Sequence, residues 1–330
     1  MRYVGVDVSR DKLDVSKAPG KSCRFANTAM GIGAAVDWLR TQGPLAELQV
    51  VLEPTSTYHQ EFMLALAEAG VRFSVINPAR AKAFGAMRGV RAKTDSVDAR
   101  LLALFGETNE PQPHPAPDAD QERLKALRRH LEWLQGQVNE VKNRLEAANR
   151  SPWTVAPVRE SLQRTLRERQ DELKRVEREL RAYVRQDERW ADQVALLVTI
   201  PSVGLKTAVL LLSELPPVER CSSAKQWVAF SGLNPAPRES GKSLSGSHIS
   251  RMGSPRIRRG LFMPALSALG HNVFVRDMNE RLKERGKKGK ERNVAAMVKL
   301  LRLGFGVLKS GSPFDPLYTH RPASSLATVS

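Results

Sequence analysis

Apolar and polar positions alternate in short blocks over the first 106 residues. Four β-prone runs are expected to form strands, at residues 3–6, 13–15, 48–52 and 72–76. Helical character is found at residues 34–39, 62–67 and 96–105. The run 48–52 is almost wholly apolar, as in a strand that is buried on both faces. Strands that alternate with helices predict an α/β layer fold with a mixed sheet.

A different pattern follows a proline-rich linker at residues 110–117. Apolar residues recur there at spacings of three and four over three heptads, which predicts a coiled-coil helix. They are Leu124, Leu127, Leu131, Leu134, Val138, Val141 and Leu145. Ser151 and Pro152 end this helix, and a second apolar stripe runs from Leu162 to Tyr183. The two helices can pair within one chain or between chains, and the pattern favours neither arrangement.

The remainder of the chain is expected to be mainly helical. A Gly/Ser-rich loop is predicted at residues 231–250, basic helices continue to about residue 309, and residues 310–330 are expected to form a loose tail. The chain is therefore divided into an α/β domain at 1–106, a linker and coiled coil at 107–190, and a mainly α domain at 191–330.

Charge is distributed unevenly over these three parts. The 330 residues carry a net charge of +17, of which +4 falls in residues 1–106, +1 in residues 107–190 and +12 in residues 191–330. The nearly neutral middle part is interpreted as a solvated surface. The excess in the last part favours a face that binds nucleic acid.

Several classes of protein are excluded by composition. No apolar stretch approaches the ~20 residues that span a bilayer, and acidic residues interrupt the apolar character of the first 20 residues. Cys23 and Cys221 are the only cysteines, so neither a disulfide framework nor a cysteine-based zinc site is expected. The protein is expected to be soluble and cytoplasmic, without a membrane partner.

Four acidic residues stand at positions typical of a metal site. Asp7 lies at the end of the first predicted strand, and Glu53 follows the apolar strand 48–52. Asp95 and Asp98 share one face at the start of a predicted helix. Carboxylates gathered at one sheet edge would repel one another unless cations were bound, and hard ions such as Mg²⁺ prefer oxygen ligands. Two such ions support phosphoryl transfer.

Each of these acids also has a plain structural explanation. Asp95 and Asp98 are favoured by the dipole at a helix N-terminus. Glu53 precedes a proline and fits a turn at a strand end, and Asp7 can pair with Arg10. The order of the four acids on their predicted elements is what favours a joint site.

Four motifs in this order resemble the DEDD transposases, which are insertion-sequence recombinases related to the Piv invertases. The motifs are Val4-Gly-Val-Asp-Val-Ser9, Leu52-Glu-Pro-Thr-Ser-Thr-Tyr58, Val75-Ile-Asn-Pro78 and Lys93-Thr-Asp-Ser-Val-Asp-Ala-Arg100. The resemblance implies a RuvC-like, RNase H-type first domain in which Asp7, Glu53, Asp95 and Asp98 bind Mg²⁺, or alternatively Mn²⁺. It also implies a coiled coil, a reactive serine in the C-terminal domain and, for some members, a structured bridge RNA as guide.

The reactive serine is nominated by the resemblance and not by composition. Five serines lie between residues 240 and 250, and Gly/Ser loops are more often just flexible. The family motif matches at Glu239-Ser240-Gly241, which nominates Ser240. The implied chemistry is attack of Ser240 on a DNA phosphate, which gives a transient phosphoserine link and a free 3′-hydroxyl.

Candidate nucleic-acid contacts surround this loop and continue beyond it. Residues 200–208 are similar to a helix–hairpin–helix that holds phosphate, although Ser202 stands where glycine is usual and a core-packing turn explains the segment equally well. Clustered basic side chains neutralise backbone phosphates. The candidates are Lys93, Arg238, Lys242, Arg251, Arg256, Arg258, Arg259, Lys287 and Lys288.

The sequence therefore predicts a Mg²⁺-dependent transposase or site-specific DNA recombinase. Its expected partners are donor and target DNA, a structured guide RNA and further copies of itself, as a homodimer or homotetramer. Two alternatives stay open. One is a RuvC-like nuclease that hydrolyses DNA with metal ions alone, and the other is a non-catalytic nucleic-acid-binding protein that assembles through its coiled coil. A sugar-kinase-like ATPase is disfavoured because no phosphate-binding glycine loop follows Asp7.

Overall fold

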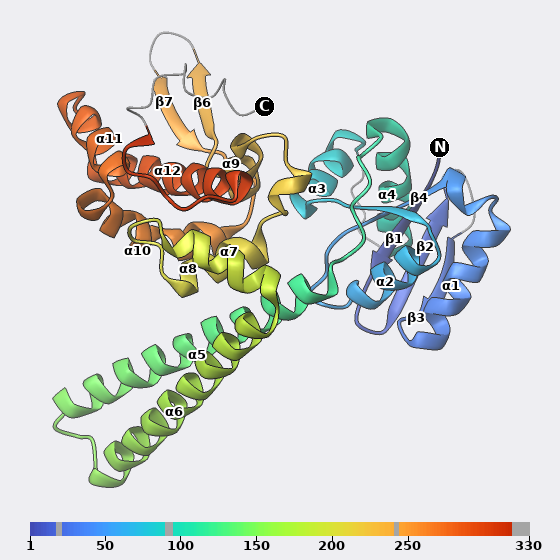
Figure 1. The fold of residues 1–330 in the computed structure, drawn as a ribbon. Helices are drawn as coiled ribbons and strands as arrows, with labels where there is room; N and C mark the ends of the chain where they lie inside the picture. The colour runs from blue at the N-terminus through green and yellow to red at the C-terminus, as the bar shows by residue number, and fades with distance from the viewer. Residues whose placement is uncertain (18–21, 90–94, 241–243, 319–330) are drawn as a thin grey trace. The chain divides into compact units, whose positions relative to one another are not determined.

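The computed structural model describes residues 1–17, 22–89, 95–240 and 244–318 (Figure 1). The chain divides into two compact units, Met1–Asp118 and Ala119–Ser330, which are treated separately below. The finer division at residues 106 and 190 stays a prediction.

The first unit is built on a five-stranded mixed sheet with the strand order β3-β2-β1-β4-β5. Strands β1, β2 and β3 pair antiparallel, whereas β4 lies parallel to β1 and β5 lies parallel to β4. The strands are β1 (Arg2–Val8), β2 (Lys12–Lys17), β3 (Ser22–Ala26), β4 (Leu48–Leu52) and β5 (Arg72–Val75). The predicted mixed α/β fold is confirmed for this unit.

Helices cover both faces of the sheet. They are α1 (Ala29–Thr41), α2 (Gln60–Glu68), α3 (Pro78–Met87) and α4 (Asp95–Asn109), with a 3₁₀ turn at Leu45–Glu47. Because side chains alternate along a strand, Val4, Val6 and Val8 pack with α1 and α2, whereas Tyr3 packs with α3 and α4 on the opposite face. Val51 of β4 belongs to the same α3–α4 face as Tyr3.

Two elements of this unit were not expected from the sequence. Strand β3 has no fully buried residue, so it lacks the apolar run that reveals a strand. Helix α3 is short and weakly amphipathic, and its start is defined locally, because Asn77 accepts a hydrogen bond from the amide of Ala79 and Pro78 stands in the first turn.

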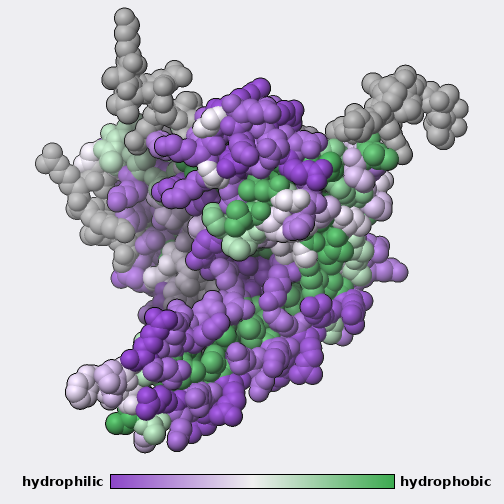
Figure 2. All heavy atoms as spheres, turned by 90° about the vertical axis from the view of Figure 1, so that its left-hand side faces the viewer, coloured by the Kyte–Doolittle hydropathy of each residue, from purple (hydrophilic) through white to green (hydrophobic). Residues whose placement is uncertain are grey.

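The second unit begins with a long helical hairpin, α5 (Ala119–Arg150) and α6 (Ala156–Gln186). These helices pair with each other within the chain, which is one of the two arrangements that the heptad pattern left open. At the base of the hairpin, Leu131, Leu134 and Leu180 are buried in the core of the unit. Farther along, Leu145 and Leu162 are only half-buried. Figure 2 shows hydrophobic side chains in a narrow band between hydrophilic ones over the helical hairpin.

The rest of the second unit is mainly helical, as predicted. Its elements are α7 (Glu188–Val198), α8 (Leu205–Glu214), a 3₁₀ turn (Val218–Arg220), α9 (Ala224–Ser231), β6 (Pro235–Ser240), β7 (Leu244–Ile249), α10 (Pro255–His271), α11 (Val273–Glu284) and α12 (Gly289–Ser310). They share one apolar core, in which Trp227 and Leu300 are buried. No helix within the described ranges is long and apolar enough to cross a membrane.

Two details of this unit differ from expectation. The segment 231–250 is not merely a loop, because β6 and β7 form an antiparallel pair whose register runs from Pro235 opposite Ile249 to Ser240 opposite Leu244. The tail is packed at its start, since the Phe314 ring lies 5.4 Å from that of Phe274, edge to face.

Candidate active site and nucleic-acid interface

A row of acidic residues crosses three neighbouring strands of the sheet. Gly5 lies opposite Val51 and Val6 opposite Leu52 in the parallel β1–β4 pair, so Asp7 and Glu53 are the next neighbours at the strand ends. Gly5 and Val51 lie on the α3–α4 face of the sheet. Asp7 and Glu53 each follow two residues later, so their side chains point to that same face. The structure brings Asp7 and Glu53 to one edge of the sheet, as the sequence predicts.

Helix α4 lies directly against β1 because both elements carry glycine at the contact. A Cβ on Gly5 would collide with the backbone of Ala99 and Ala103, and one on Gly106 would collide with the ring of Tyr3. Moving along β1 from Tyr3 to Gly5 thus moves backwards along α4, so the helix runs antiparallel to the strand. Asp7 is the next residue on this face of β1. Because α4 runs antiparallel to the strand, the first turn of the helix lies toward Asp7.

That first turn contains the other two predicted acids. Asp95 is the first residue of α4, and Asp98 follows three residues later, next to Ala99. Asp7, Glu53 and Asp98 are each half-buried, whereas the side chain of Asp95 lies outside the described residues. Among the side chains that are described, no three metal-ligating groups converge on one point. The joint four-carboxylate site stays a prediction, supported by the shared face and the helix direction.

One further acid adjoins this row and was not singled out from the sequence. Asp14 lies directly opposite Asp7 in the antiparallel β1–β2 pair and is 3% exposed. Its carboxylate accepts a hydrogen bond of 2.9 Å from Arg24 Nε of β3 and lies 3.6 Å from Lys12 Nζ. The Asp14 carboxylate is thus already engaged by two neighbouring cations of the sheet.

The nominated serine lies on the β6–β7 hairpin of the second unit. Ser240 is the last residue of β6 and stands opposite Leu244, next to residues 241–243, which lie outside the described part of the chain. Its side chain is likewise undescribed. The backbone places Ser240 at the end of the hairpin that is farther from the core.

The base of this hairpin is held by close backbone contacts. Gly232 ends α9 with φ 68°, and a Cβ on it or on Gly253 would overlap the backbone of the other segment. Arg251 donates its amide to the Gly232 carbonyl at 3.0 Å. Arg258 Nη1 donates to the carbonyls of Ser231 and Gly253, at 2.9 and 3.0 Å. The guanidinium of Arg258 is therefore engaged in fixing the hairpin base, and burial beside Arg251 lowers its pKa.

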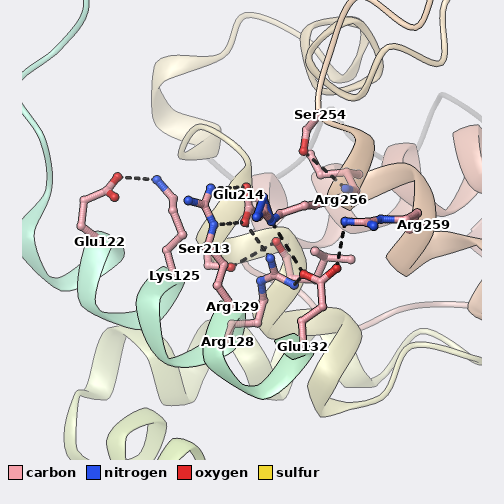
Figure 3. A network of polar contacts seen from close by, with 12 residues as sticks. Glu122, Lys125, Arg128, Arg129, Glu132, Ser213, Glu214, Ser254, Arg256 and Arg259 are labelled. Atoms are coloured by element: carbon pink, nitrogen blue, oxygen red, sulfur yellow. Dashed lines mark hydrogen bonds and ion pairs between the residues drawn. The ribbon is translucent and has the colours of Figure 1, made fainter. Parts of the chain in front are cut away.

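Two of the predicted nucleic-acid contacts are engaged by an acid of the long hairpin (Figure 3). Arg256 Nε and Arg259 Nη2 of α10 lie 3.7 and 3.1 Å from the carboxylate of Glu132 of α5. Both arginines remain partly exposed, at 40% and 69% of the side-chain surface. They line a groove of about 450 Å³ between α5, α6, α8 and α10.

A neighbouring ion cluster joins α5 to α8. Glu214 is 6% exposed and accepts from Arg128 at 2.7 Å and from Arg129 at 2.9 and 3.1 Å (Figure 3). Burial raises the pKa of Glu214, but the hydrogen bonds and charges of Arg129 and Arg128 outweigh it, and the pKa is lowered. This buried pairing attaches the hairpin to the rest of the unit.

The remaining predicted contacts are distributed as follows. Lys287 pairs with Glu291 at 3.5 Å, and Lys288 is the N-cap of α12. Arg238 is in β6 with an undescribed side chain, and Lys93 and Lys242 lie outside the described residues. The nucleic-acid contacts of these residues stay a prediction.

Comparison with known protein families decides the identity of this chain. Residues 4–148 match a transposase model of the DEDD type, and residues 194–280 match the transposase IS116/IS110/IS902 family. The two matched regions follow each other in the chain and together cover most of it. The chain belongs to this transposase family.

Full-length relatives agree with this assignment. The pilin gene-inverting proteins of Moraxella bovis and Moraxella lacunata are each 27% identical to the transposase over 320 residues, which is 95% of this chain and 97% of theirs. An insertion element protein of 43.6 kDa from Streptomyces coelicolor is 25% identical over 120 residues, or 36% of this chain and 30% of its own.

The family assignment fixes the general activity. The transposase is an enzyme that acts in DNA strand cleavage and rejoining, and DNA is its partner. Transposases of the DEDD type usually use divalent metal ions. We call the ends of β1 and β4, with Asp7 and Glu53, the acidic edge. It fits such an ion chemically, because these two residues present hard carboxylate oxygens at adjacent strand ends.

The helix–hairpin–helix-like segment of the transposase forms the turn between α7 and α8. Ser202 adopts φ 75°, the left-handed conformation for which glycine is usual. Its hydroxyl lies 3.2 Å from that of Ser267 in α10, and Lys206 pairs with Glu177 of α6. The expected turn is present, and its polar groups are engaged with neighbouring helices.

Proposed function

We propose that this transposase recombines DNA through a transient phosphoserine link, with Mg²⁺ bound at the acidic edge of a RuvC-like domain. The observation that carries the proposal is the shared face of Asp7 and Glu53 at adjacent strand ends, toward which the Asp95–Asp98 turn of α4 is directed. The strand order, with three antiparallel strands followed by two parallel ones, supports the RNase H-like assignment.

Ser240 is the proposed nucleophile. Its hydroxyl oxygen attacks the phosphorus of a DNA phosphodiester, so that a serine O–P bond forms and the P–O3′ bond breaks. The serine proton ends on the departing oxygen, which becomes a free 3′-hydroxyl. Attack by another 3′-hydroxyl on the phosphoserine then rejoins DNA and restores the serine without hydrolysis.

The carboxylates and the serine belong to different units of the chain. Asp7, Glu53, Asp95 and Asp98 are proposed to hold the metal at the scissile phosphate, within one subunit or across two. When bound, divalent ions activate a nucleophile and stabilise a leaving oxygen in phosphoryl transfer. The carboxylates supply the charge that makes such binding favourable, because clustered acids repel one another without a cation.

The proposed partners are donor DNA, target DNA, a structured guide RNA and further copies of the chain. The +12 net charge of residues 191–330 supports a polyanion partner of substantial size. The names of the full-length relatives support inversion or transfer of a DNA segment between two sites. The half-buried apolar residues along the α5–α6 hairpin support assembly into a homodimer or homotetramer.

The covalent link is the step to test. Incubated with guide RNA and both DNA partners, Ser240→Ala should form no recombinant product and no denaturation-resistant protein–DNA adduct. Ser250→Ala is the matched control, because Ser250 lies on the same hairpin and its backbone amide bonds the Asn234 carbonyl. Recombination by Ser240→Ala at the wild-type rate would contradict the phosphoserine mechanism. Metal-dependent cleavage without an adduct would favour a hydrolytic RuvC-like nuclease instead.

Guidance by RNA has its own readout. Omission of the RNA should abolish recombination, and a change in the part of the RNA that pairs with target DNA should redirect the insertion site. Recombination at an unchanged site and rate without RNA would exclude guidance while leaving the serine chemistry intact.

A further inference from the structure

A second groove of the transposase lies beside the serine hairpin, between α9, the base of the β6–β7 pair, α11 and α12. Its volume is about 910 Å³, within the range of ligand-binding sites. Pro235, His248, Ile249 and Arg251 of the hairpin base contribute to its wall. None of the four proposed catalytic carboxylates lines it.

The rim of this groove is strongly basic. Its cations come from α9, from the segment after β7 and from α12, and five of them form no ion pair with a carboxylate in the described part of the chain. These five are Lys225, Arg251, Lys290, Lys299 and Arg302. The single acid of the lining, Glu291, lies 3.5 Å from Lys287 Nζ and accepts from the Lys288 amide at 2.9 Å. The groove therefore carries a large uncompensated positive charge.

The cations are held close together by the fold. Lys299 and Arg302 are three residues apart and share a face of α12. Burial lowers the pKa of Lys299, and the neighbouring charges of Arg302 and Arg281 lower it further. Like charges crowded in this way gain most from a ligand that brings several negative charges at once.

The floor of the groove is apolar. Val228 and Leu233 are buried there, and Met278, Val294 and Val298 are partly buried around them. His248, an exposed residue of β7, adds an imidazole ring to the wall. The groove therefore offers cations at its rim and apolar side chains with one imidazole ring in its interior.

We propose that this groove binds an unpaired segment of nucleic acid, with its phosphates on the basic rim and its bases against the apolar floor. In a duplex, the flat faces of the bases are stacked on one another, and only phosphates, sugars and groove edges are available. An unpaired strand exposes base faces and phosphates together, and proteins that bind such strands combine a basic groove with a surface on which bases stack.

This inference rests on the proposed function and extends it. Pro235 lines the groove, and Ser240 lies five residues farther along β6, roughly 17 Å at the rise of a strand. A strand held in the groove thus leaves along the hairpin that carries the proposed nucleophile. Unpaired segments arise both in a guide RNA and in DNA whose strands are being exchanged.

Binding by the full-length protein tests the groove without requiring recombination. Fluorescence anisotropy is measured with a labelled unpaired 12-nucleotide DNA, the same sequence as RNA, and the matching DNA duplex. Lys299→Gln/Arg302→Gln should weaken binding of the unpaired strand at least about tenfold. It should also reduce the slope of log affinity against log salt by about 1.4, because each lost phosphate contact on a single strand contributes about 0.7. Duplex affinity should change less than about twofold.

Two further variants separate charge from stacking and guard against misfolding. Lys225→Gln/Lys290→Gln removes two exposed cations and should reproduce the same loss. His248→Ala removes the imidazole ring of the wall and should weaken binding of the unpaired strand at least about fivefold.

Arg164→Gln/Arg167→Gln on the exposed surface of α6 is the control with an equal change in charge. If it weakens the unpaired strand as much as the groove variants do, or if the groove variants weaken duplex and unpaired strand equally, the proposal is overturned. Tighter binding of RNA assigns the groove to the guide, and tighter binding of DNA assigns it to the exchanged strand. Ser240→Ala should retain full binding here, so the failure of either proposal is recognised separately.

Discussion

The acidic edge of the first unit and the basic groove of the second unit both gather like charges, but they are built differently. Asp7 and Glu53 are carried to one edge by the register of two parallel strands, and Gly5 lets α4 lie close beside them. The cations of the groove come from separate helices, such as Lys225 of α9 and Lys299 of α12, and meet only because these helices share a core.

The difference explains how each region would respond to change. A sheet edge is fixed by backbone hydrogen bonds, so replacing a single carboxylate removes chemistry and leaves the scaffold intact. The position of a groove between helices depends instead on side-chain packing and on ion pairs elsewhere in the unit, such as that of Glu214, whereas charge changes on its rim alter binding. The five predictions below probe this comparison, from the largest expected effect to the smallest.

Asp7→Asn should reduce recombination by about 1000-fold or more, since a lost metal ligand costs several kcal/mol of transition-state stabilisation. The fold should be retained, because Asp7 stands at the end of β1 and its backbone pairing is unchanged. The measurement is the initial rate of product formation with DNA binding determined in parallel. Asp11→Asn, an 88% exposed acid in the adjoining turn, should recombine normally. Equal losses in both variants would remove the special role of the sheet edge.

Glu214→Gln should destabilise the second unit by about 3 kcal/mol, because Arg128, only 11% exposed, is left without its full counter-charge. Urea unfolding followed by circular dichroism measures the loss. A change below about 0.5 kcal/mol would show that the ion cluster does not attach the α5–α6 hairpin to the remaining helices.

The same residue gives a pH dependence with a defined sign. The folded state lowers the pKa of Glu214 below its ordinary 4.5. Its stabilisation is therefore fully present above about pH 4.5 and is lost as pH falls through the lowered pKa. In Glu214→Gln this part of the acid unfolding profile should disappear, and a profile identical to that of the wild type would contradict the assignment.

Gly5→Ala should destabilise the first unit by about 2 kcal/mol, because the added Cβ meets the backbone of α4 at Ala99 and Ala103. Gly33→Ala in α1 is the matched control, since nothing lies within 4 Å of its added Cβ. That change should be neutral or should stabilise by up to about 1 kcal/mol. Thermal unfolding measures the stability of both variants. Equal stability of the two would contradict the close packing of α4 against β1.

Glu132→Gln should raise affinity for duplex DNA by about threefold, because Arg256 and Arg259 lose a competing carboxylate. The effect is small since these ion pairs are partly exposed. Glu140→Gln, which removes the partner of Arg144 on the same helix, changes the charge equally and should leave affinity within about twofold. Titrations at two salt concentrations distinguish a local effect from a general one.

Much of the first unit was predictable because its signals are local. The apolar run Leu48–Leu52, the acid that follows it and the acid at the end of β1 are all visible in the sequence, and parallel pairing brings them together. Strand β3 and helix α3 were missed because β3 is an edge strand without buried residues and α3 has little amphipathic character. Asp14 was missed because its proximity to Asp7 depends on the β1–β2 register.

In the second unit, periodicity predicted the helices but not their partners. The heptads of α5 and α6 specify an apolar stripe, and only the folded chain shows that the two stripes face each other. Lys299 and Arg302 are three residues apart in a long amphipathic helix, and the sequence pattern alone indicates that they are ordinary surface charges. Only the folded chain shows that these two cations line the same groove as Lys225 and Arg251.

The sequence by itself determined most of the element types, the order of the four acids and the asymmetry of charge, because periodicity, motif order and composition are properties of the linear chain. The tertiary structure decided which α5 and α6 stripes pair, which face of the sheet carries the acids and where the cations of α9 and α12 meet. Those outcomes depend on contacts between residues far apart in the chain, and their positions are set by packing around a shared core, which no local pattern encodes.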